Sequence, residues 1–283
     1  MLKHQGQLAI IMRQLRRNRG ALIGLILVVL EVIISLTAQW IAPYDPLDQV
    51  VTDALRPPSL EHWMGTDDVG RDILSRIIHG SQISLRVGLI SVSIAGVVGV
   101  LLGMTAGYYG KWFDDVVMRL IDILLAFPGI LLALTIIAIL GPGLFNVMIA
   151  VGIGAIPSYT RVARGSTLSV RERDYVMSAR VVGCSDARII LRYILPNVLP
   201  SIVVLATLGV AGAILTASGL SFLGLGAQPP APEWGAMLTS GRTYLRQAWW
   251  FATFPGLAIM LTVLCINLFG DGLRDALDPK LRR

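Results

Sequence analysis

Six stretches of this 283-residue chain are almost free of charged residues, and they limit its fold more than any other feature. A helix needs about 20 predominantly apolar residues to cross the hydrocarbon core of a bilayer. A soluble domain could not hide so much apolar surface, because 54% of the residues are hydrophobic and only 15% are charged. The sequence therefore predicts an all-α integral membrane protein with six transmembrane helices. The stretches are Ala21–Ala42, Val87–Tyr109, Ile123–Leu140, Leu144–Tyr159, Ile194–Phe222 and Ala248–Phe269.

The distribution of charge predicts how these helices are oriented. The tail Met1–Gly20 has five Lys or Arg and no acid, and Arg161–Arg192 has seven arginines, whereas Pro43–Gly80 carries seven acids against three arginines. The positive-inside rule places both termini and the arginine-rich loop in the cytoplasm. The net charge of +6 thus reflects topology. It does not indicate a nucleic-acid partner, because no aromatic platform is interleaved with the basic residues.

The first stretch is expected to be an uncleaved anchor, since it is longer than the apolar region of a signal peptide and no A-x-A site follows it. Turn-forming residues punctuate both predicted outer loops. A short amphipathic helix is expected at Asp72–Gly80, and a short helix is expected after Pro232. The predicted division is a cytoplasmic basic tail (1–20), the first span (21–42), an outer loop (43–83), a transmembrane domain with helices two to six (84–272), containing the cytoplasmic loop 161–194 and the outer loop 219–247, and a cytoplasmic tail (273–283).

Small residues recur at every fourth position in three of the predicted spans. Such a pattern lets helix backbones approach closely. It predicts packing within the bundle or, alternatively, a subunit interface. The residues are Ser91, Ala95, Gly99, Gly103 and Gly107 in the second span, Ala150, Gly154 and Ser158 in the fourth, and Gly209, Ala213 and Ala217 in the fifth.

Three charged residues within the spans need an explanation, because a charge in the bilayer core is costly. Glu31 lies midway along the first span. We expect its carboxyl group to pack against a neighbouring helix, with a role in substrate or proton transfer as the alternative. The third helix is expected to begin near Val116, ahead of its uncharged stretch. Arg119 and Asp122 then lie near its cytoplasmic end, three residues apart, and so share a face. A structural ion pair between them is expected, with a transport role as the alternative.

The chain lacks the sequence patterns of a catalytic or nucleotide-binding protein. It has no G-x-x-x-x-G-K-[ST], G-x-S-x-G, H-E-x-x-H or C-x-x-C pattern. Its two cysteines, Cys184 and Cys265, fall in a cytoplasmic loop and a span, so a disulfide between them is not expected. The three histidines show no metal-ligand spacing. We therefore expect no enzymatic activity, no cofactor and no metal site in this chain, and any energy source must lie in a partner.

The polar segment Arg173–Pro200 interrupts the apolar sequence on the predicted cytoplasmic side. Asp174 is expected to cap a first helix, and Gly183 to end it in the left-handed conformation that glycine adopts without steric cost. Ser185 is expected to cap a second helix, which carries Arg188. From these residues alone, the segment predicts either a protein docking site or a basic loop that binds lipid headgroups.

This segment resembles the EAA loop of the membrane subunits of ATP-binding-cassette importers. Met177, Ser178 and Ala179 stand at the E-A-A positions, Gly183 follows after three residues, and Leu195 and Pro196 stand at the L-P positions. Two residues depart from the pattern, since Met177 replaces the glutamate and Tyr193 takes the isoleucine position. The resemblance implies docking on an ATPase subunit, through the candidate residues Asp174, Tyr175, Met177, Ser178, Ala179, Gly183, Ser185, Arg188, Leu195 and Pro196.

Longer strings resemble the C-type membrane subunit of dipeptide and oligopeptide importers, including MGTDDVGRDILSRIIHG, DDVVMRLIDILLAFPG and FPGLAIMLTVLCINLFGDGLRDALDPKL. The resemblance implies a type I importer fold in a bacterial or archaeal cytoplasmic (inner) membrane and uptake of short peptides, with nickel chelates, glutathione or another small solute as alternatives. It also implies a homologous B-type membrane subunit, a solute-binding protein, and two ATPase subunits that use ATP and Mg²⁺. A stand-alone channel or secondary transporter is the competing class.

Overall fold

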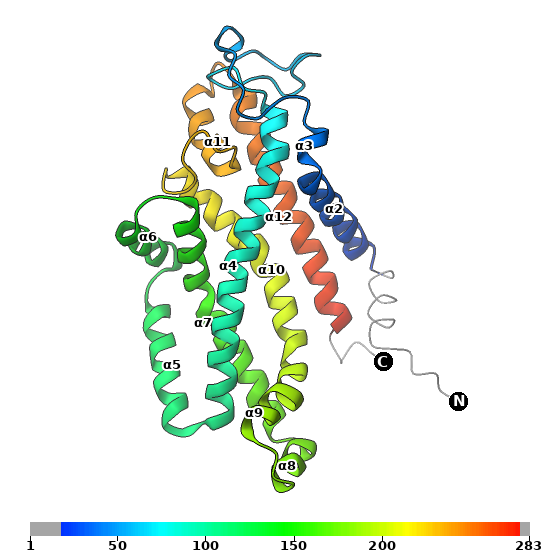
Figure 1. Cartoon of the computed structure of the whole chain (residues 1–283), viewed down its shortest axis with the longest axis vertical. Helices are drawn as coiled ribbons and strands as arrows, with labels where there is room; N and C mark the ends of the chain where they lie inside the picture. Colours follow the sequence, from blue (N-terminus) through cyan, green and yellow to red (C-terminus); the bar gives the residue numbers. More distant parts are fainter. Residues whose placement is uncertain (1–17, 278–283) are drawn as a thin grey trace, which may run out of the picture.

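The computed structural model describes residues 18–277, which form helices and loops without a β-strand. Most of the predicted basic N-terminal tail, residues 1–17, and the last six residues of the predicted C-terminal tail lie outside the described residues. The long helices run roughly along one axis of the molecule (Figure 1). In chain order the elements are α2 (Arg19–Leu36), α3 (Ala38–Ile41), η1 (Val51–Asp53), α4 (Ile73–Tyr109), α5 (Lys111–Ala126), α6 (Gly129–Leu140), α7 (Leu144–Arg171), α8 (Asp174–Val181), α9 (Asp186–Ile189), η2 (Ile190–Ile194), α10 (Leu195–Phe222), α11 (Trp234–Gly241), η3 (Arg242–Tyr244) and α12 (Trp249–Leu277).

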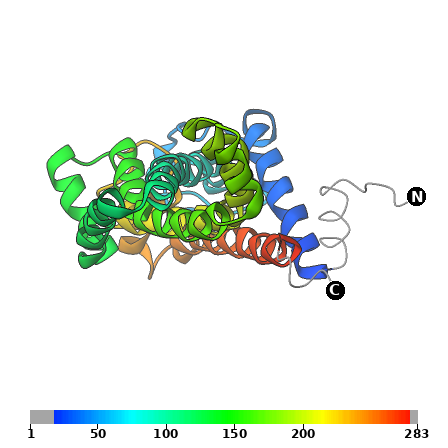
Figure 2. The ribbon, with the colours of Figure 1, turned by 90° about the horizontal axis from the view of Figure 1, so that it is seen from below.

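Helix α4 is the centre of the bundle. It packs most extensively along α7 and also contacts α10, α5 and α2. Seen from below, α2 and α12 lie together at one side of the molecule, and α5 and α6 lie at the opposite side (Figure 2). The core between α4, α7 and α10 is built from aliphatic and small side chains, together with the buried Tyr159.

The small residues of α4 allow its close approach to α7. A Cβ atom added at Gly99 would stand 2.6 Å from Cβ of Tyr159, and one at Gly103 would meet Cβ of Ala163 at 2.8 Å. Both distances are shorter than real contacts, so a side chain at either glycine would push the helices apart. For this stripe, packing within the bundle is therefore confirmed.

Within residues 18–277, fewer helices than the six predicted are long and apolar enough to cross a membrane. Four helical segments of residues 18–277 are long and apolar enough to span a bilayer: α2, α4, the continuous run from α9 to α10, and α12. The pair α5 and α6 would add a fifth. Helix α7 contains the fourth predicted span, but its apolar part ends at Tyr159 and it is not among these helices. Six spans and cytoplasmic termini remain predictions.

Two expected helices have different boundaries in the structure. The third predicted span is broken between α5 and α6, which meet at 91°. Pro128 explains the break, because it has no N–H to donate and forces the preceding Phe127 out of the helical region (φ −90°, ψ 131°). The short helix expected at Asp72–Gly80 is instead the start of the 37-residue α4, which Asp72 caps by accepting from the Ser75 N–H. The short helix expected after Pro232 is confirmed as α11.

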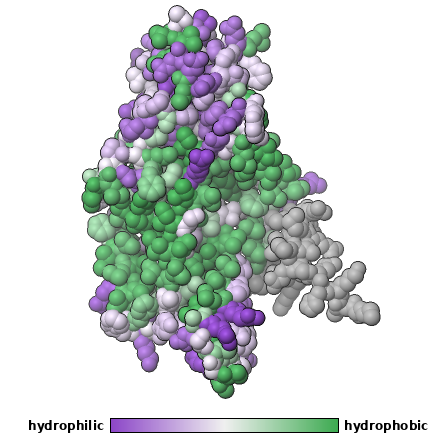
Figure 3. All heavy atoms as spheres, viewed as in Figure 1, coloured by the Kyte–Doolittle hydropathy of each residue, from purple (hydrophilic) through white to green (hydrophobic). Residues whose placement is uncertain are grey.

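The surface has the polarity expected of a membrane protein. Figure 3 shows hydrophobic residues around the middle of the face drawn, with most of the hydrophilic residues at its two ends. One end holds the loop 43–72 and α11, and the other holds α8 and α9 (Figure 1). The two polar regions that the sequence predicts on opposite sides of a membrane are thus separated by the length of the bundle.

Candidate functional site

The segment Arg173–Pro200 forms a helical hairpin at one end of the bundle. Helix α8 ends at Val181, and Gly183, two residues later, has a φ of +83°. The Cys184 N–H donates to the Ala179 carbonyl and the Gly183 N–H donates to the Arg180 carbonyl, both at 3.0 Å. These bonds satisfy the last carbonyls of the helix, as in a glycine-terminated helix end. The predicted glycine stop is therefore confirmed.

The two predicted helix caps differ from expectation. Asp174 is the first residue of α8, and Arg173 occupies the capping position, so the predicted cap at Asp174 is wrong. Its carboxylate still lies in the first turn, where it complements the helix dipole. Ser185 does occupy the capping position of α9, but its side chain makes no capping hydrogen bond.

After α9 the chain passes through one π-helical turn, η2, before α10 begins. Pro196 lies in the first turn of α10, and Pro200 one turn later. Neither residue has an N–H for the helical ladder. The widened turn lies immediately before these prolines and joins the hairpin directly to a membrane-spanning helix. A displacement of the hairpin would therefore act on α10 without an intervening loop.

The candidate docking residues lie on both sides of the hairpin. The Ala179 side chain is buried and joins the bundle core, and Leu195 is half-buried, so neither offers much surface to a partner. Val181 and Val182 are exposed by 87% and 82%, more than Met177 at 56%. Sequence reasoning missed these two valines, although an apolar pair beside a terminating glycine is a visible signal. The exposed candidates are Asp174, Tyr175, Met177, Ser178, Gly183, Ser185, Arg188 and Pro196.

Polar contacts and core packing fix the hairpin to the bundle. The Tyr108 hydroxyl at the end of α4 donates to the Asp186 carboxylate of α9 at 2.6 Å. The Arg180 guanidinium of α8 lies 5.4 Å from the centre of the Tyr108 ring, within range of a cation–π contact. Val176 of α8 and Ile189 of α9 are fully buried and join the core of the bundle. The hairpin is thus rigidly joined to α4.

The intramembrane charges have partners on other helices. Thr262 of α12 donates its hydroxyl to the Glu31 carboxylate of α2 at 2.6 Å, so the expected packing of Glu31 against a neighbouring helix is confirmed. Asp122 pairs with Arg161 of α7 at 2.7 Å. The expected ion pair between Arg119 and Asp122 does not form, because α7 brings Arg161 to the carboxylate, and helical spacing alone cannot reveal that contact.

The opposite end of the molecule has a cap with buried charges. Asp67 accepts from Nε of Arg71 at 2.6 Å, and His62 lies 2.9 Å from the Asp72 carboxylate. Glu233 is 2% exposed and accepts the N–H groups of Gly235 and Ala236 at the start of α11. Burial raises the pKa of the Glu233 carboxyl group, although these hydrogen bonds oppose the shift.

Comparison with known proteins agrees with this architecture. Residues 99–283 match the model of a family described as the binding-protein-dependent transport system inner membrane component. The chain belongs to this family. Residues 6–58 match the N-terminal transmembrane domain of oligopeptide transport permease C. The protein is therefore a multi-pass inner-membrane component of an ATP-binding-cassette importer, and the C-type assignment from the sequence is confirmed.

Similar curated proteins are permease proteins of peptide and glutathione transport systems. A di/tripeptide transport system permease from Pseudomonas aeruginosa is 49% identical over 271 residues, which cover 94% of this chain and 89% of the relative. A dipeptide transport system permease from Alkalihalophilus pseudofirmus is 48% identical, covering 95% and 89%. A glutathione transport system permease from Escherichia coli is 51% identical, also covering 95% and 89%.

Solved structures show the importer fold independently of close sequence similarity. An inward-facing MetNI methionine ABC transporter has a chain with a TM-score of 0.58 and 18% identity, covering 73% of this chain and 98% of that one. An amino acid ABC transporter gives a TM-score of 0.52 at 14% identity, covering 71% and 94%. The type I importer fold expected from the sequence is therefore confirmed for the shared region.

Proposed function

We propose that this chain is one of two membrane subunits that carry short peptides into the cell, and that its hairpin Arg173–Pro200 docks on an ATPase subunit. The relatives named above transport di- and tripeptides or glutathione, which is itself a peptide. Membership of the importer family supports a second membrane subunit, two ATPase subunits and a solute-binding protein as partners. ATP and Mg²⁺ would be bound by the ATPase subunits.

The exposed apolar end of the hairpin carries this proposal. Met177, Val181 and Val182 project from a rigid hairpin into solvent at the polar end of the molecule. Exposed apolar side chains of this kind are typical of a protein interface. The hairpin also exposes Arg173, Arg180, Arg188 and Arg192, the residues that a headgroup-binding loop would use, so the crosslinking experiment below decides between the two. When the ATPase subunits close on ATP, the hairpin would carry their motion through Tyr108 into α4 and through η2 into α10.

The other end would receive the solute-binding protein. Leu60 is 96% exposed and Trp63 is 72% exposed, both on the loop 43–72. An exposed tryptophan is a common anchor at protein interfaces. Docking at one end and ATP-driven closure at the other would bias the two membrane subunits between inward- and outward-facing states.

Substitution of Gly183 tests the coupling role. No atom lies within 4 Å of a Cβ at this position, so a valine has room but is strained at a φ of +83° by about 1–2 kcal/mol or more. We expect Gly183→Val to insert in the membrane and to lower peptide uptake relative to ATP hydrolysis. Gly183→Asn is the matched control, because asparagine tolerates the left-handed conformation. Normal uptake by Gly183→Val would contradict the coupling role.

Crosslinking tests the identity of the docking partner. In a chain with Cys184→Ser and Cys265→Ala, a cysteine at the exposed Ser178 should crosslink to an ATPase subunit in the assembled transporter. A cysteine at Leu60, at the opposite end, should not. Crosslinking of Ser178→Cys to lipid alone would support the headgroup-binding alternative.

Competition uptake with the cognate binding protein tests the solute class. We expect unlabelled di- and tripeptides to block uptake of a labelled dipeptide, and nickel chelates to leave it unchanged. Uptake that requires ATP hydrolysis, and that persists when ion gradients are dissipated, would exclude the channel and secondary-transporter class.

A further inference from the structure

The ion pair between Asp122 and Arg161 lies on an outward face of the chain. Asp122 is on α5 and Arg161 is on α7, and the two side chains are 60% and 53% exposed. A second ion pair joins the same helices nearer their polar end. There the Arg164 guanidinium donates two hydrogen bonds, of 2.5 and 2.6 Å, to the Asp114 carboxylate. That pair is much less exposed, at 31% for Arg164 and 12% for Asp114, and it already links α5 to α7. The Asp122–Arg161 pair is therefore a second and more exposed link between the same two helices.

The exposed ion pair is level with the uncharged part of α4. Gly99 of α4 contacts Tyr159 and Thr160 of α7, so Arg161 is level with the part of α4 just beyond Gly99. That level is near the middle of the uncharged stretch Val87–Tyr109. Facing lipid there would be costly for both charges. The face that bears them must therefore meet water or another polar surface.

Glycines with no packing role continue this face. A Cβ added at Gly154 or Gly165 of α7, or at Gly212 of α10, would meet nothing within 4 Å, in contrast to the crowded Gly99 and Gly103. Gly154, Ser158, Arg161 and Gly165 follow one another at helical spacing along α7. They therefore form a strip of three small residues and one arginine, on a face of α7 that α4 does not cover.

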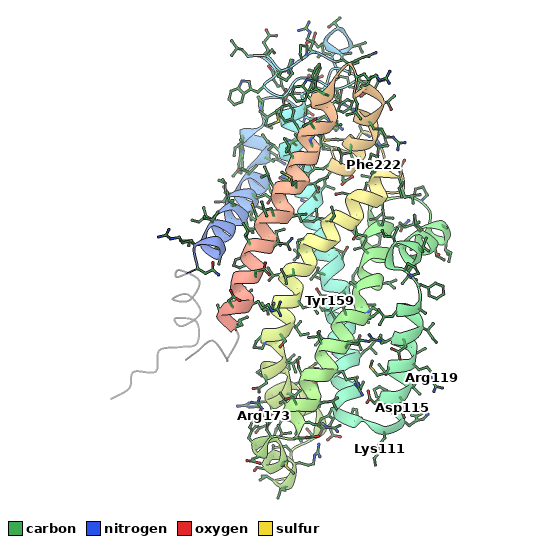
Figure 4. All side chains as sticks on the ribbon, turned by 180° about the vertical axis from the view of Figure 1, so that it is seen from behind. Lys111, Asp115, Arg119, Tyr159, Arg173 and Phe222 are labelled. Atoms are coloured by element: carbon green, nitrogen blue, oxygen red, sulfur yellow. The ribbon has the colours of Figure 1, made fainter. Side chains whose placement is uncertain are left out.

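A cavity of about 430 Å³ lies beside this strip, between α4, α6, α7 and α10. Its walls include the Ser158 and Thr216 side chains and the open backbone at Gly154 and Gly212. Tyr159, which lies in the middle of the bundle (Figure 4), also lines the cavity. Ser158 lies on α7 one helical turn from Arg161, so the cavity and the ion pair adjoin.

We propose that the cavity and the Asp122–Arg161 pair form a transit site for zwitterionic short peptides on the pathway through the membrane. This inference rests on the peptide transport proposed above and adds the residues that meet the peptide. The cationic amino terminus of the peptide replaces Arg161 at the Asp122 carboxylate. The carboxylate terminus of the peptide binds the Arg161 guanidinium, because a guanidinium and a carboxylate form a favourable bidentate ion pair.

This exchange of ion-pair partners keeps both charges paired before the peptide binds and after it leaves, as a transport pathway requires. Without peptide, the two side chains neutralise one another, so neither is left as an unpaired charge in the membrane. With peptide, both remain paired. The glycines on α7 and α10 leave room for peptide side chains of different size. Their backbone does not select one kind of peptide side chain over another.

Cysteine accessibility tests whether water reaches this face. In the assembled transporter with Cys184→Ser and Cys265→Ala, we expect Ser158→Cys to react with a charged, water-soluble methanethiosulfonate reagent. The ionised thiol, which forms only where water is present, attacks the reagent and displaces methanesulfinate. The control is Leu215→Cys, at an exposed apolar position of α10 next to α12. We expect it to react far more slowly. Equally slow reaction at both positions would overturn the proposal.

Peptide protection tests the assignment of the ion pair. In detergent, without the binding protein, dialanine should slow labelling of Ser158→Cys several-fold, and N-acetyl-dialanine amide, which lacks both terminal charges, should not. Arg161→Gln and Asp122→Asn should abolish the protection. Arg119→Gln should retain it, because Arg119 lies on the outer side of α5 (Figure 4).

The outcomes separate this inference from the proposed function. Equal protection by both compounds, or protection that survives Arg161→Gln, would overturn the transit site while leaving peptide uptake by the unmodified transporter intact. Failure of that transporter to take up any peptide would instead overturn the proposed function.

Discussion

The Tyr108 hydroxyl donates a 2.6 Å hydrogen bond to the Asp186 carboxylate, and this bond joins the end of α4 to the start of α9. The contact spans 78 positions in sequence. It lies between the bundle's central helix and the hairpin proposed to receive an ATPase subunit. A hydrogen bond to a charged acceptor contributes about 1.5–3 kcal/mol, enough to make the two helices move together.

Removal of this hydroxyl should weaken the coupling between ATP hydrolysis and transport. We expect Tyr108→Phe to reduce peptide uptake per ATP hydrolysed several-fold, with little change in the amount of assembled transporter. Tyr109→Phe is the control, since Tyr109 is adjacent, exposed, and makes no side-chain hydrogen bond within residues 18–277. An equal effect of the two substitutions on the uptake-to-hydrolysis ratio, measured in proteoliposomes, would contradict the role of the bond.

Local sequence signals predicted many of the elements in this structure. Uncharged stretches long enough to cross a bilayer fall in long helices, and Gly183 ends α8 because no other residue adopts its φ of +83° at so little cost. The break at Pro128 was predictable in principle, because proline disfavours a helical conformation in the residue before it. The long apolar run Ile123–Leu140 concealed that signal.

Contacts between helices were not predictable from spacing. Gly99 and Gly154 both belong to stripes with a period of four, yet Gly99 is pressed against α7 and Gly154 meets open space. Asp122 is three residues from Arg119, but its partner comes from another helix, 39 positions away. The neighbours that decide these roles are set by tertiary packing.

The contrast between glycines predicts which of them the fold requires. Valine at Gly99 must displace α7, and overpacking of this kind costs about 1–3 kcal/mol or more. We expect Gly99→Val to lower the temperature at which the solubilised transporter aggregates. Gly165→Val carries the same loss of helix flexibility without a packing conflict, and it should change that temperature much less. Equal effects in a fluorescence size-exclusion heating assay would contradict the packing argument.

The buried Glu233 should make the outer cap more stable at low pH. Burial raises the pKa of the Glu233 carboxyl group above its ordinary value of 4.5, so the folded protein holds this proton at pH values where the unfolded chain has lost it. The resulting stability is fully present below about pH 4.5 and is lost as the pH rises through the folded pKa. We expect Glu233→Gln to flatten this part of the dependence of thermal stability on pH. A variant with the unaltered dependence would show that Glu233 does not titrate in this way.

The Arg164–Asp114 pair should stabilise the contact between α5 and α7 more than any charge on the exposed side of α5. Asp114 is buried and receives two hydrogen bonds from Arg164, so Asp114→Asn leaves a guanidinium group with one poorer acceptor, at a cost of about 1–3 kcal/mol. The adjacent Asp115 is exposed and has no ion-pair partner within residues 18–277, so Asp115→Asn changes the surface charge equally without breaking the contact.

Thermal denaturation of the two variants in the same detergent should show a drop of several degrees for Asp114→Asn and little change for Asp115→Asn. High salt should not remove the difference, because a pair this shielded from solvent is weakly screened. Matching melting temperatures would mean that apolar packing alone holds α5 in place.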